Sequence, residues 1–439
     1  MKFSQPTRIL LALVLGLGAG IAAGWSGGAW VERSAAFAEP IGGLWLNALQ
    51  MTIVPLVVAL LITGIAASAE AARASRLATR ALILFACLLL ASSVLAAVLT
   101  PALLNLFPLP GESAARLSEA LTHADVPGAA PTFADFIRGL VPNNPIAAAS
   151  SNGGVLPLIV FVLVFAFAMT KLEEKPRATL IGFFKAIADT MLIIVNWVLW
   201  IGPLGVFALA FVVGARAGGP AFHALIHYVL IVTVVGAVVW LAAWPLALVG
   251  ARIGPLRFTR AVAASQALAF STQSSLACLP PMLRASGKLG VPVAASGIVL
   301  PMAVAVFRAT GPAMNLAVAI YIAYWSGVEL TPTVLMLGVL AGATTTIGAA
   351  GIPGQATFFA SIAPICLAMG VPIAPLALLV AVETLPDLMR TLGNVSMDVA
   401  ATATIARRSG FEAEDAQSAE DRLLRGESGP EVEAETDAG

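Results

Sequence analysis

The sequence predicts an all-α polytopic membrane protein, and three observations lead to this fold class. Hydrophobic residues make up 59% of the 439-residue chain and charged residues only 11%, which is too apolar for a soluble protein of this length. Apolar runs long enough to cross a bilayer recur along the chain, and basic residues gather in alternate connections between them. The sequence contains no nucleophile elbow, metal-ligand cluster or phosphate-binding loop, so we do not expect an enzyme.

Hydropathy predicts six spans in the first 250 residues, at 8–30, 41–67, 80–107, 155–172, 181–214 and 224–250. The runs 80–107 and 181–214 are longer than the about 20 residues that a crossing helix needs, so we expect them to be tilted or extended. The first run follows Lys2 and Arg8, as in a signal peptide. It is long for that role, and we interpret it as the first span.

Basic side chains cluster at the connections that follow the second, fourth, sixth and last spans. They are Arg73, Arg76, Arg80, Lys171, Lys175, Arg177, Lys185, Arg252, Arg257, Arg260, Arg407 and Arg408. The opposite connections are mixed or acidic, at 32–39, 112–138, 214–220 and 326–331. Because basic loops stay on the cytoplasmic side, this asymmetry predicts an even number of crossings with cytoplasmic N- and C-termini. The location that we expect is a bacterial inner membrane. The acidic segment 408–439 is too polar to build a core, and we expect a disordered cytoplasmic tail.

Two regions beyond residue 250 are apolar but interrupted at their centres. In 261–283, two short arms flank the sequence STQSS, and in 334–370 two arms meet at TTT and GIPG. Each arm is too short to cross about 30 Å of hydrocarbon. Non-helical backbone at membrane depth persists only where it lines a protein cavity. We therefore interpret both regions as re-entrant helical hairpins of a transporter built from inverted repeats.

A stripe of polar and charged residues runs through the last apolar segment, 373–406. Its members follow one another at intervals of three or four residues, which places them on one face of a helix. They are Glu383, Asp387, Arg390, Asn394 and Asp398. A charge near the centre of a membrane helix costs at least about 2.5–3.5 kcal/mol. The stripe therefore predicts a binding site, and the alternative is a salt-bridge ladder with a purely structural role.

The segment 291–324 carries a further interruption, FRATGP at 307–312. Arg308 lies near mid-depth, where an arginine must face a carboxylate or water. Pro312 lacks a backbone donor and frees carbonyl groups that can bind hard cations. A plain proline kink is the alternative explanation.

The order of these features resembles the dicarboxylate/amino acid:cation symporter family, the glutamate-transporter family. The matching parts are the serine-tipped hairpin, the broken helix, the GIPG-tipped hairpin and a D-x-x-R-T-x-x-N-x-x-x-D helix, together with MTIVPLVVALLITG at 51–64. The resemblance covers about residues 8–407. It implies eight transmembrane helices plus the two hairpins, an elevator-type glutamate-transporter fold and a homotrimer. It also implies mainly trimerisation and scaffold helices in 1–250, except for about 80–107, and a transport-domain core in 251–407.

The resemblance further implies roles for individual residues. The substrate contacts would be Ser274, Ser275, Ile352, Gly354, Asp387, Arg390, Thr391 and Asn394. Arg390 matches an arginine that pairs with the substrate side-chain carboxylate, which suits the planar fork of a guanidinium. Asp387 matches the acid that takes the substrate ammonium group. Asp398, together with Asn394, matches a sodium site, and Glu383 lies one turn before Asp387.

One motif departs from the family pattern. Where relatives carry N-M-D-G-T, this sequence has FRATG at 307–311, so two cation ligands are missing and Arg308 adds a fixed positive charge. A cation about 4 Å from an arginine would be repelled by about 4 kcal/mol at an effective dielectric of about 20. We therefore expect coupling to fewer sodium ions, or to protons through Glu383, Asp387 or Asp398, with Arg308 taking part.

The leading hypothesis is a secondary active transporter for aspartate, glutamate or related dicarboxylates, coupled to sodium or protons and without a cofactor. One alternative is a C4-dicarboxylate or other carboxylate transporter with proton coupling, in which Arg308 engages Asp387. Another is an uncoupled channel-like protein or a membrane sensor. The expected partners are a small carboxylate substrate, the lipid bilayer and further copies of the chain, and no nucleic acid.

Overall fold

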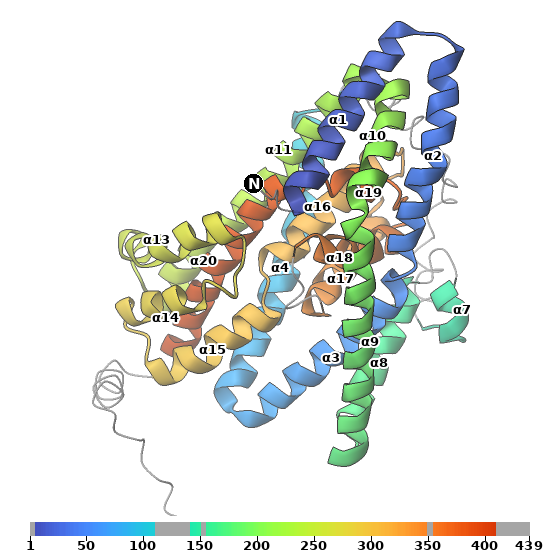
Figure 1. Cartoon of the computed structure of the whole chain (residues 1–439). Helices are drawn as coiled ribbons and strands as arrows, with labels where there is room; N and C mark the ends of the chain where they lie inside the picture. Colours follow the sequence, from blue (N-terminus) through green and yellow to red (C-terminus); the bar gives the residue numbers. More distant parts are fainter. Residues whose placement is uncertain (1–4, 110–140, 151–154, 349–353, 410–439) are drawn as a thin grey trace, which may run out of the picture.

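The computed structural model describes residues 5–109, 141–150, 155–348 and 354–409. All regular secondary structure in these ranges is helical (Figure 1), which confirms the all-α prediction for the described residues. Six helices there are long and apolar enough to cross a membrane: Thr7–Ser26, Ala29–Glu70, Arg76–Leu106, Glu174–Trp200, Gly219–Gly250 and Val293–Trp325. The predicted acidic tail from residue 410 onward, like the whole of the connection 112–138, lies outside the described residues.

The first two predicted spans differ from the helices that form. Helix α1 (Gln5–Ser26) reverses at Gly27 and Gly28, which have φ values of 64° and 102°, into α2 (Ala29–Gln50). Positive φ suits glycine because it has no Cβ. The expectation of a loop at 32–39 was wrong, since these residues are helical in α2. Glutamate is a good helix former, so these acids are compatible with a helix. Arg216 of α10 pairs with both, with Nη2 at 3.2 Å from Glu32 and 3.0 Å from Glu39.

The predicted span 41–67 is divided between α2 and α3 (Ile53–Ala74), with a break at residues 51–52, before α4 (Arg76–Leu106) begins. The predicted span 181–214 is likewise divided into α9 (Glu174–Trp200) and α10 (Gly202–Ala217). Pro203 lies in the first turn of α10, where its missing N–H is harmless, and it cannot continue α9. Hydropathy alone missed both breaks because the residues around them are apolar.

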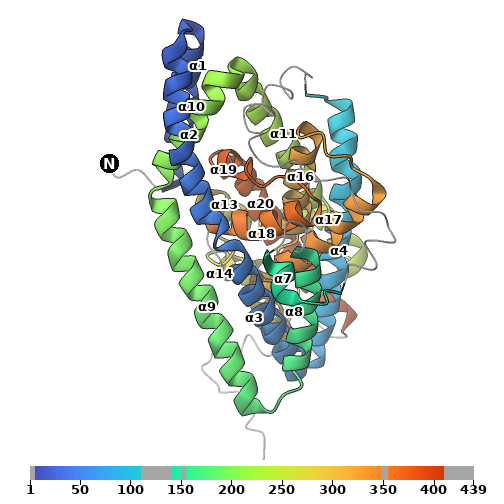
Figure 2. The same cartoon turned by 90° about the vertical axis from the view of Figure 1, so that its right-hand side faces the viewer.

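Glycines bring α1 and α10 into close backbone contact. A Cβ added to Gly20 would lie 2.2 Å from the Phe211 carbonyl oxygen, and one added to Gly214 would lie 2.5 Å from that of Leu17. Small residues are the usual means of helix association inside a membrane. Helices α1, α2 and α10 therefore form one tight column, which Figure 2 shows beside the rest of the bundle.

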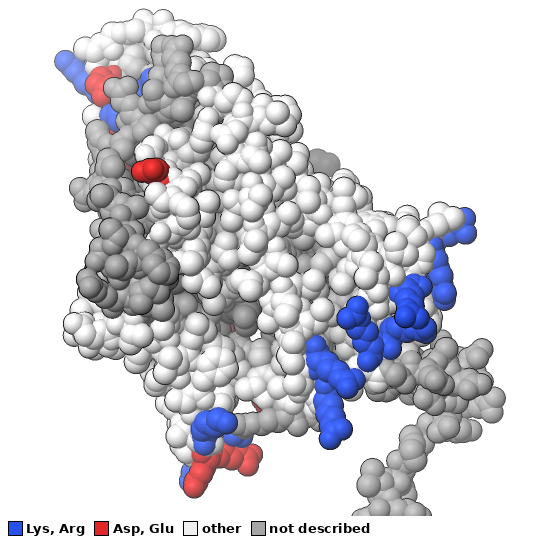
Figure 3. Space-filling model, turned by 180° about the vertical axis from the view of Figure 1, so that it is seen from behind, with Lys and Arg blue, Asp and Glu red and all other residues white. Residues whose placement is uncertain are grey.

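The column continues into α9, which runs along the edge of the molecule (Figure 2) and packs on α3. Helix α8 (Val155–Met169) also packs on α3, and α7 (Pro145–Ser150) packs on α8. On the face shown in Figure 3, lysine and arginine gather at the lower end. A broad surface with few charges separates them from the charges at the upper end. This distribution fits a belt of lipid around the middle of the molecule.

The remaining helices surround α20 (Thr384–Arg408), which is buried along most of its length. They are α11 (Gly219–Leu241), α12 (Ala243–Pro245), the π-helical turn Leu246–Gly250, α13 (Pro255–Thr272), α14 (Leu279–Lys288), α15 (Val293–Val306), α16 (Thr310–Trp325), α17 (Pro332–Gly348), α18 (Gly354–Ala368) and α19 (Leu376–Leu379). Helices α4, α11, α13, α15 and α16 all contact α20. This half of the molecule therefore has a charged helix at its centre.

Both predicted hairpins correspond to pairs of packed helices, α13 with α14 and α17 with α18. At the first tip, α13 ends at Gln273, which has a left-handed φ of 51°. The second tip, 349–353, lies outside the described residues. The broken segment between the hairpins behaves differently from a proline kink, because α16 begins at Thr310 and Pro312 lies in its first turn. The break itself is at 307–309, before the proline.

Candidate functional site

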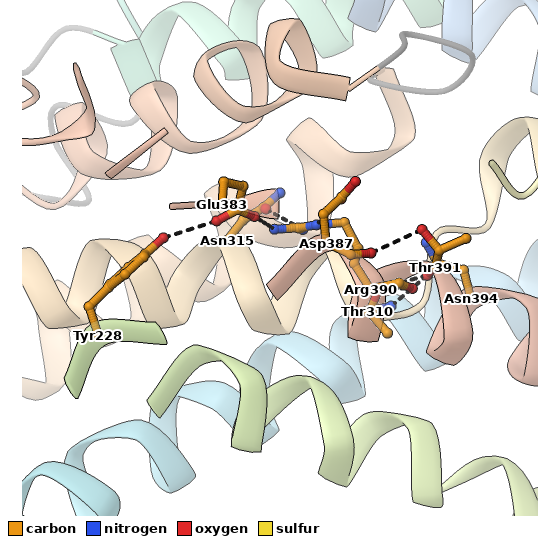
Figure 4. A network of polar contacts seen from close by, with 8 residues as sticks. All are labelled: Tyr228, Thr310, Asn315, Glu383, Asp387, Arg390, Thr391 and Asn394. Carbon is orange, nitrogen blue, oxygen red and sulfur yellow. Dashed lines mark hydrogen bonds and ion pairs between the residues drawn. The ribbon is translucent and has the colours of Figure 1, made fainter. Parts of the chain in front are cut away.

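The predicted stripe lies along α20 in the interior of the helical bundle. Glu383 is the residue before the helix, and Asp387, Arg390, Asn394 and Asp398 follow within it. Asp387 is half-buried, whereas the other four are buried, with Arg390 only 6% exposed and Asp398 fully enclosed. Figure 4 shows the stripe from Glu383 to Asn394 with its partners from α11 and α16. Since buried charges are costly, each of them must be explained by its surroundings.

Arg390 is held by three side chains, one on each of its nitrogens. Its Nη2 lies 2.6 Å from Glu383 Oε1, and its Nε lies 3.2 Å from Asp387 Oδ1. Its Nη1 donates to Asn315 Oδ1 of α16 at 2.7 Å. A guanidinium carries five N–H groups, two of them on each terminal nitrogen. The three contacts therefore leave one N–H on each terminal nitrogen, which is the number that a bidentate carboxylate requires.

Glu383 is fixed from a second direction. Its Oε2 accepts a hydrogen bond at 3.0 Å from the hydroxyl of Tyr228, a fully buried residue of α11. Tyr228 and Asn315 were missed by the sequence analysis. Asn315 had a detectable signal, because an amide in an otherwise apolar membrane helix faces a partner or a cavity. Tyr228 gave a weaker one, as one of only three tyrosines in the chain.

The start of α16 is attached to α20 by Thr310 and Asn394. Asn394 Oδ1 accepts from the Thr310 backbone N–H at 3.0 Å and lies 2.8 Å from its hydroxyl. The same hydroxyl lies 3.0 Å from the Arg390 carbonyl oxygen. A Cβ on Gly393 would lie 2.3 Å from Thr310 Cγ2, so only glycine permits this approach. Asn394 thus holds the break in place through the backbone N–H of Thr310, the first residue of α16, which lacks a helical partner.

Asp398 has a different environment. Neither of its carboxylate oxygens has a hydrogen-bond partner among the described residues. Arg308, from the break before α16, interacts electrostatically with both Asp398 and Asp387. An enclosed carboxylate without hydrogen bonds fits a cation, yet the nearby guanidinium already supplies positive charge. No group of three or more His, Cys, Asp or Glu side chains in the described ranges is arranged to hold a metal ion.

The remaining predicted contacts are less closely tied to the stripe. Thr391 Oγ1 donates to the Asp387 carbonyl at 3.0 Å, within its own helix. Ser274 and Ser275 are half-buried at the first hairpin tip, where Ser274 Oγ accepts from the Ala277 N–H at 3.3 Å. In the described residues, no hydrogen bond joins either serine to α20. Ile352 lies outside the described residues, and Gly354 is the first residue of α18.

The fold and the site together define a class, a polytopic membrane transporter with a buried charged site, not an enzyme. The chain belongs to the sodium:dicarboxylate symporter family, whose model matches residues 6–408. It is similar to the proton/glutamate-aspartate symporter of Escherichia coli, 29% identical over 419 residues, which are 93% of each chain. It is also similar to the proton/sodium-glutamate symport protein of Bacillus subtilis, 27% identical over 418 residues, which are 94% of each chain.

A further relative is the neutral amino acid transporter B(0) of Oryctolagus cuniculus, 30% identical over 430 residues. The match covers 89% of this chain and 77% of that protein. Transport, symport and membrane location therefore follow from family membership, and the predicted family is confirmed. Because the relatives differ in the substrates they are named for, the substrate of this chain has to be argued from its own site.

Proposed function

We propose that this chain is a cation-coupled secondary transporter of amino acids with an acidic side chain, aspartate or glutamate. The observation that carries the proposal is the buried guanidinium of Arg390, oriented on three nitrogens and left with two N–H groups. Two N–H groups in a plane recognise a carboxylate bidentately. A neutral amino acid would leave this buried cation without that partner. The names of the E. coli and B. subtilis relatives support the same substrate class.

Asp387 completes the proposed recognition. It is the most exposed of the stripe's acids that contact Arg390, with 22% of its side chain accessible. An accessible carboxylate next to the carboxylate-binding arginine can accept the ammonium group of an amino acid. Thr391 and Asn394, one and two turns further along α20, are proposed contacts to the substrate α-carboxylate and its surroundings. Ser274, Ser275, Ile352 and Gly354, at the two hairpin tips, are proposed to close over the ligand.

A second candidate substrate class has its own observation. Asp387 is already engaged by Arg390, with 3.2 Å between Oδ1 and Nε, and it also interacts electrostatically with Arg308. If this pairing persists with ligand, no acid is available for an ammonium group, and a C4-dicarboxylate becomes the expected substrate. The sequence-based alternative, in which Arg308 engages Asp387, stays a proposal, and the ion pair of Asp387 with Arg390 is compatible with it.

For coupling, we propose that Arg308 replaces one bound sodium ion by supplying a permanent positive charge to Asp398. The sequence departure at 307–311 and the electrostatic contact in the structure both support this. Transport would then depend on a proton, or on fewer sodium ions than a relative with the full motif uses. We also propose eight crossing helices, an elevator movement of the half around α20, a homotrimer, and an inner-membrane location with cytoplasmic termini.

Uptake into proteoliposomes tests the proposal. Labelled aspartate is offered with a sodium gradient, a proton gradient or neither, and glutamate, succinate, fumarate and neutral amino acids are added as competitors. We expect saturable aspartate uptake that is inhibited by glutamate. Inhibition by succinate and fumarate alone would favour the dicarboxylate candidate. Steep uptake that requires several sodium ions would contradict the role of Arg308, and non-saturable flux would indicate a channel-like protein.

A further inference from the structure

Tyr228 contacts the charged stripe from α11, a helix to which neither the sequence motifs nor the proposed function assigns a role. Its hydroxyl donates to Glu383 Oε2 at 3.0 Å, while Glu383 Oε1 lies 2.6 Å from Arg390 Nη2. The carboxylate of Glu383 is therefore divided, with one oxygen on the tyrosine and the other on the arginine. The guanidinium receives only one oxygen from this acid as a result.

The ring of Tyr228 is itself firmly held. It meets the ring of Tyr321, on α16, edge to face with centroids 5.4 Å apart. The Tyr321 hydroxyl donates to the Ala224 carbonyl, one turn before Tyr228 on α11, at 2.9 Å. Both tyrosines are fully buried. The pair therefore joins α11 to α16, the helix that also presents Asn315 to Arg390.

His227 extends this contact to a third helix. Its Nδ1 lies 3.0 Å from the Tyr321 hydroxyl oxygen, and its Nε2 donates to the Phe107 carbonyl at 2.8 Å. Phe107 caps the end of α4. Three helices thus meet around Tyr228, and its ring has little freedom to move away from Glu383.

We propose that Tyr228 is a positioning residue that makes the site selective for ligands with a side-chain carboxylate, an inference that rests on the proposed function. A carboxylate prefers to pair with a guanidinium through both of its oxygens. A Glu383 released by Tyr228 would turn its second oxygen toward Arg390 and occupy the N–H group that the substrate needs. By retaining that oxygen, Tyr228 keeps Glu383 as an orienting partner and prevents it from acting as an internal competitor.

The test is aspartate uptake by the Tyr228→Phe variant, which keeps the ring contact with Tyr321 and removes only the hydroxyl. We expect the KM for aspartate to rise about tenfold, the order expected for losing one hydrogen bond to a charged group. The maximal rate should stay within about twofold, because no group in contact with the ligand is removed. Tyr324→Phe is the matched control. Tyr324 is half-buried on α16, the helix that carries Tyr321, and it has no hydrogen bond to Glu383 in the described residues.

A double-mutant cycle with Glu383→Gln separates positioning from general packing. The amide of glutamine cannot place two acceptor oxygens on Arg390, so adding Tyr228→Phe to Glu383→Gln should change the KM by less than about twofold. Glu383→Asp is a second route, because the shorter side chain withdraws the carboxylate from Tyr228 while keeping its charge. Glu383→Asp should reproduce the rise in KM. It therefore tests the proposal even if the Tyr228→Phe protein does not insert into the membrane.

Three outcomes would overturn the positioning role. They are an unchanged KM in Tyr228→Phe, an equal rise in Tyr324→Phe, or additive effects in the cycle. If the wild-type protein shows saturable aspartate uptake and any of these outcomes occurs, only the role of Tyr228 is refuted and the proposed function stands. A wild-type protein that takes up no acidic amino acid refutes the proposed function, and the selectivity assigned to Tyr228 with it.

Discussion

The two ends of the charged stripe on α20 compensate buried charge in different ways. Near the start of the helix, Arg390 and Glu383 are fixed by short directional bonds to each other and to two neighbouring helices, α16 and α11. Further along, Asp398 is fully enclosed, its carboxylate has no hydrogen bond in the described residues, and Arg308 interacts with it electrostatically. Directional bonds hold a group in the geometry that recognition needs, whereas a carboxylate balanced only by a field responds to any change of nearby charge. Under the proposed function, the end near Arg390 binds the substrate and the end near Asp398 takes part in coupling.

Replacing Arg390 should have the largest effect. Arg390→Ala leaves Glu383 and Asp387 close together without their cation, and removing one partner of a buried ion pair costs about 3–5 kcal/mol. We expect aspartate uptake and binding to fall at least about 100-fold. The exposed Arg284 of α14 provides a control, and Arg284→Ala should retain uptake. Saturable uptake that survived in Arg390→Ala would remove substrate recognition from this end of the stripe.

Replacing Arg308 tests the other end. In Arg308→Met, Asp398 loses its compensating charge, and the site should gain a sodium requirement. Sodium at 100 times its Kd would stabilise such a protein by about 2.7 kcal/mol. Thermal unfolding in sodium chloride and in potassium chloride measures this difference, which should be larger in the variant than in the wild-type protein.

The matched control for this gain is Arg308→Met combined with Asp398→Asn. The double variant has no buried carboxylate to attract a cation, so the added sodium effect should disappear. A sodium effect of equal size in the wild-type protein and in Arg308→Met would show that Arg308 does not substitute for an ion.

The smallest expected effect concerns the packing between the two ends. A Cβ at Gly393 would clash with Thr310 Cγ2 at 2.3 Å, so Gly393→Ala must displace the start of α16. Overpacking of this kind costs about 1–3 kcal/mol. A Cβ at Gly297 of α15 would meet no atom within 4 Å, so Gly297→Ala should leave stability unchanged or raise it slightly. Melting temperatures in detergent compare the two, and equal values would show that the α16–α20 contact can relax.

Much of the fold followed from pattern. The apolar runs predicted a helical membrane protein, the interrupted regions predicted helix pairs at α13–α14 and α17–α18, and the spacing of the stripe predicted the helical face that α20 presents. The errors arose where the polarity of a segment did not reveal whether it is helical or where a helix is interrupted. The acids at 32–39 indicated a loop, but glutamate is a good helix former, and Arg216, distant in the sequence, pairs with both acids. The interruption at 307–312 is a break at 307–309 and not the alternative proline kink, because Pro312 lies in the first turn of α16, after the break.

The sequence by itself determined which charges are placed in the membrane, because a period of three to four residues is a property of the chain alone. It also determined the family and the departure at 307–311. Only the tertiary structure decided how these charges are paired. The partners come from other parts of the chain: Tyr228 from α11, Asn315 from α16 and Arg308 from the break before α16. All three are distant from α20 in the sequence, so no helical spacing links them to the stripe. Electrostatic and hydrogen-bonding partners are selected by distance in space, so the different surroundings of Arg390 and Asp398 emerge only once the helices pack.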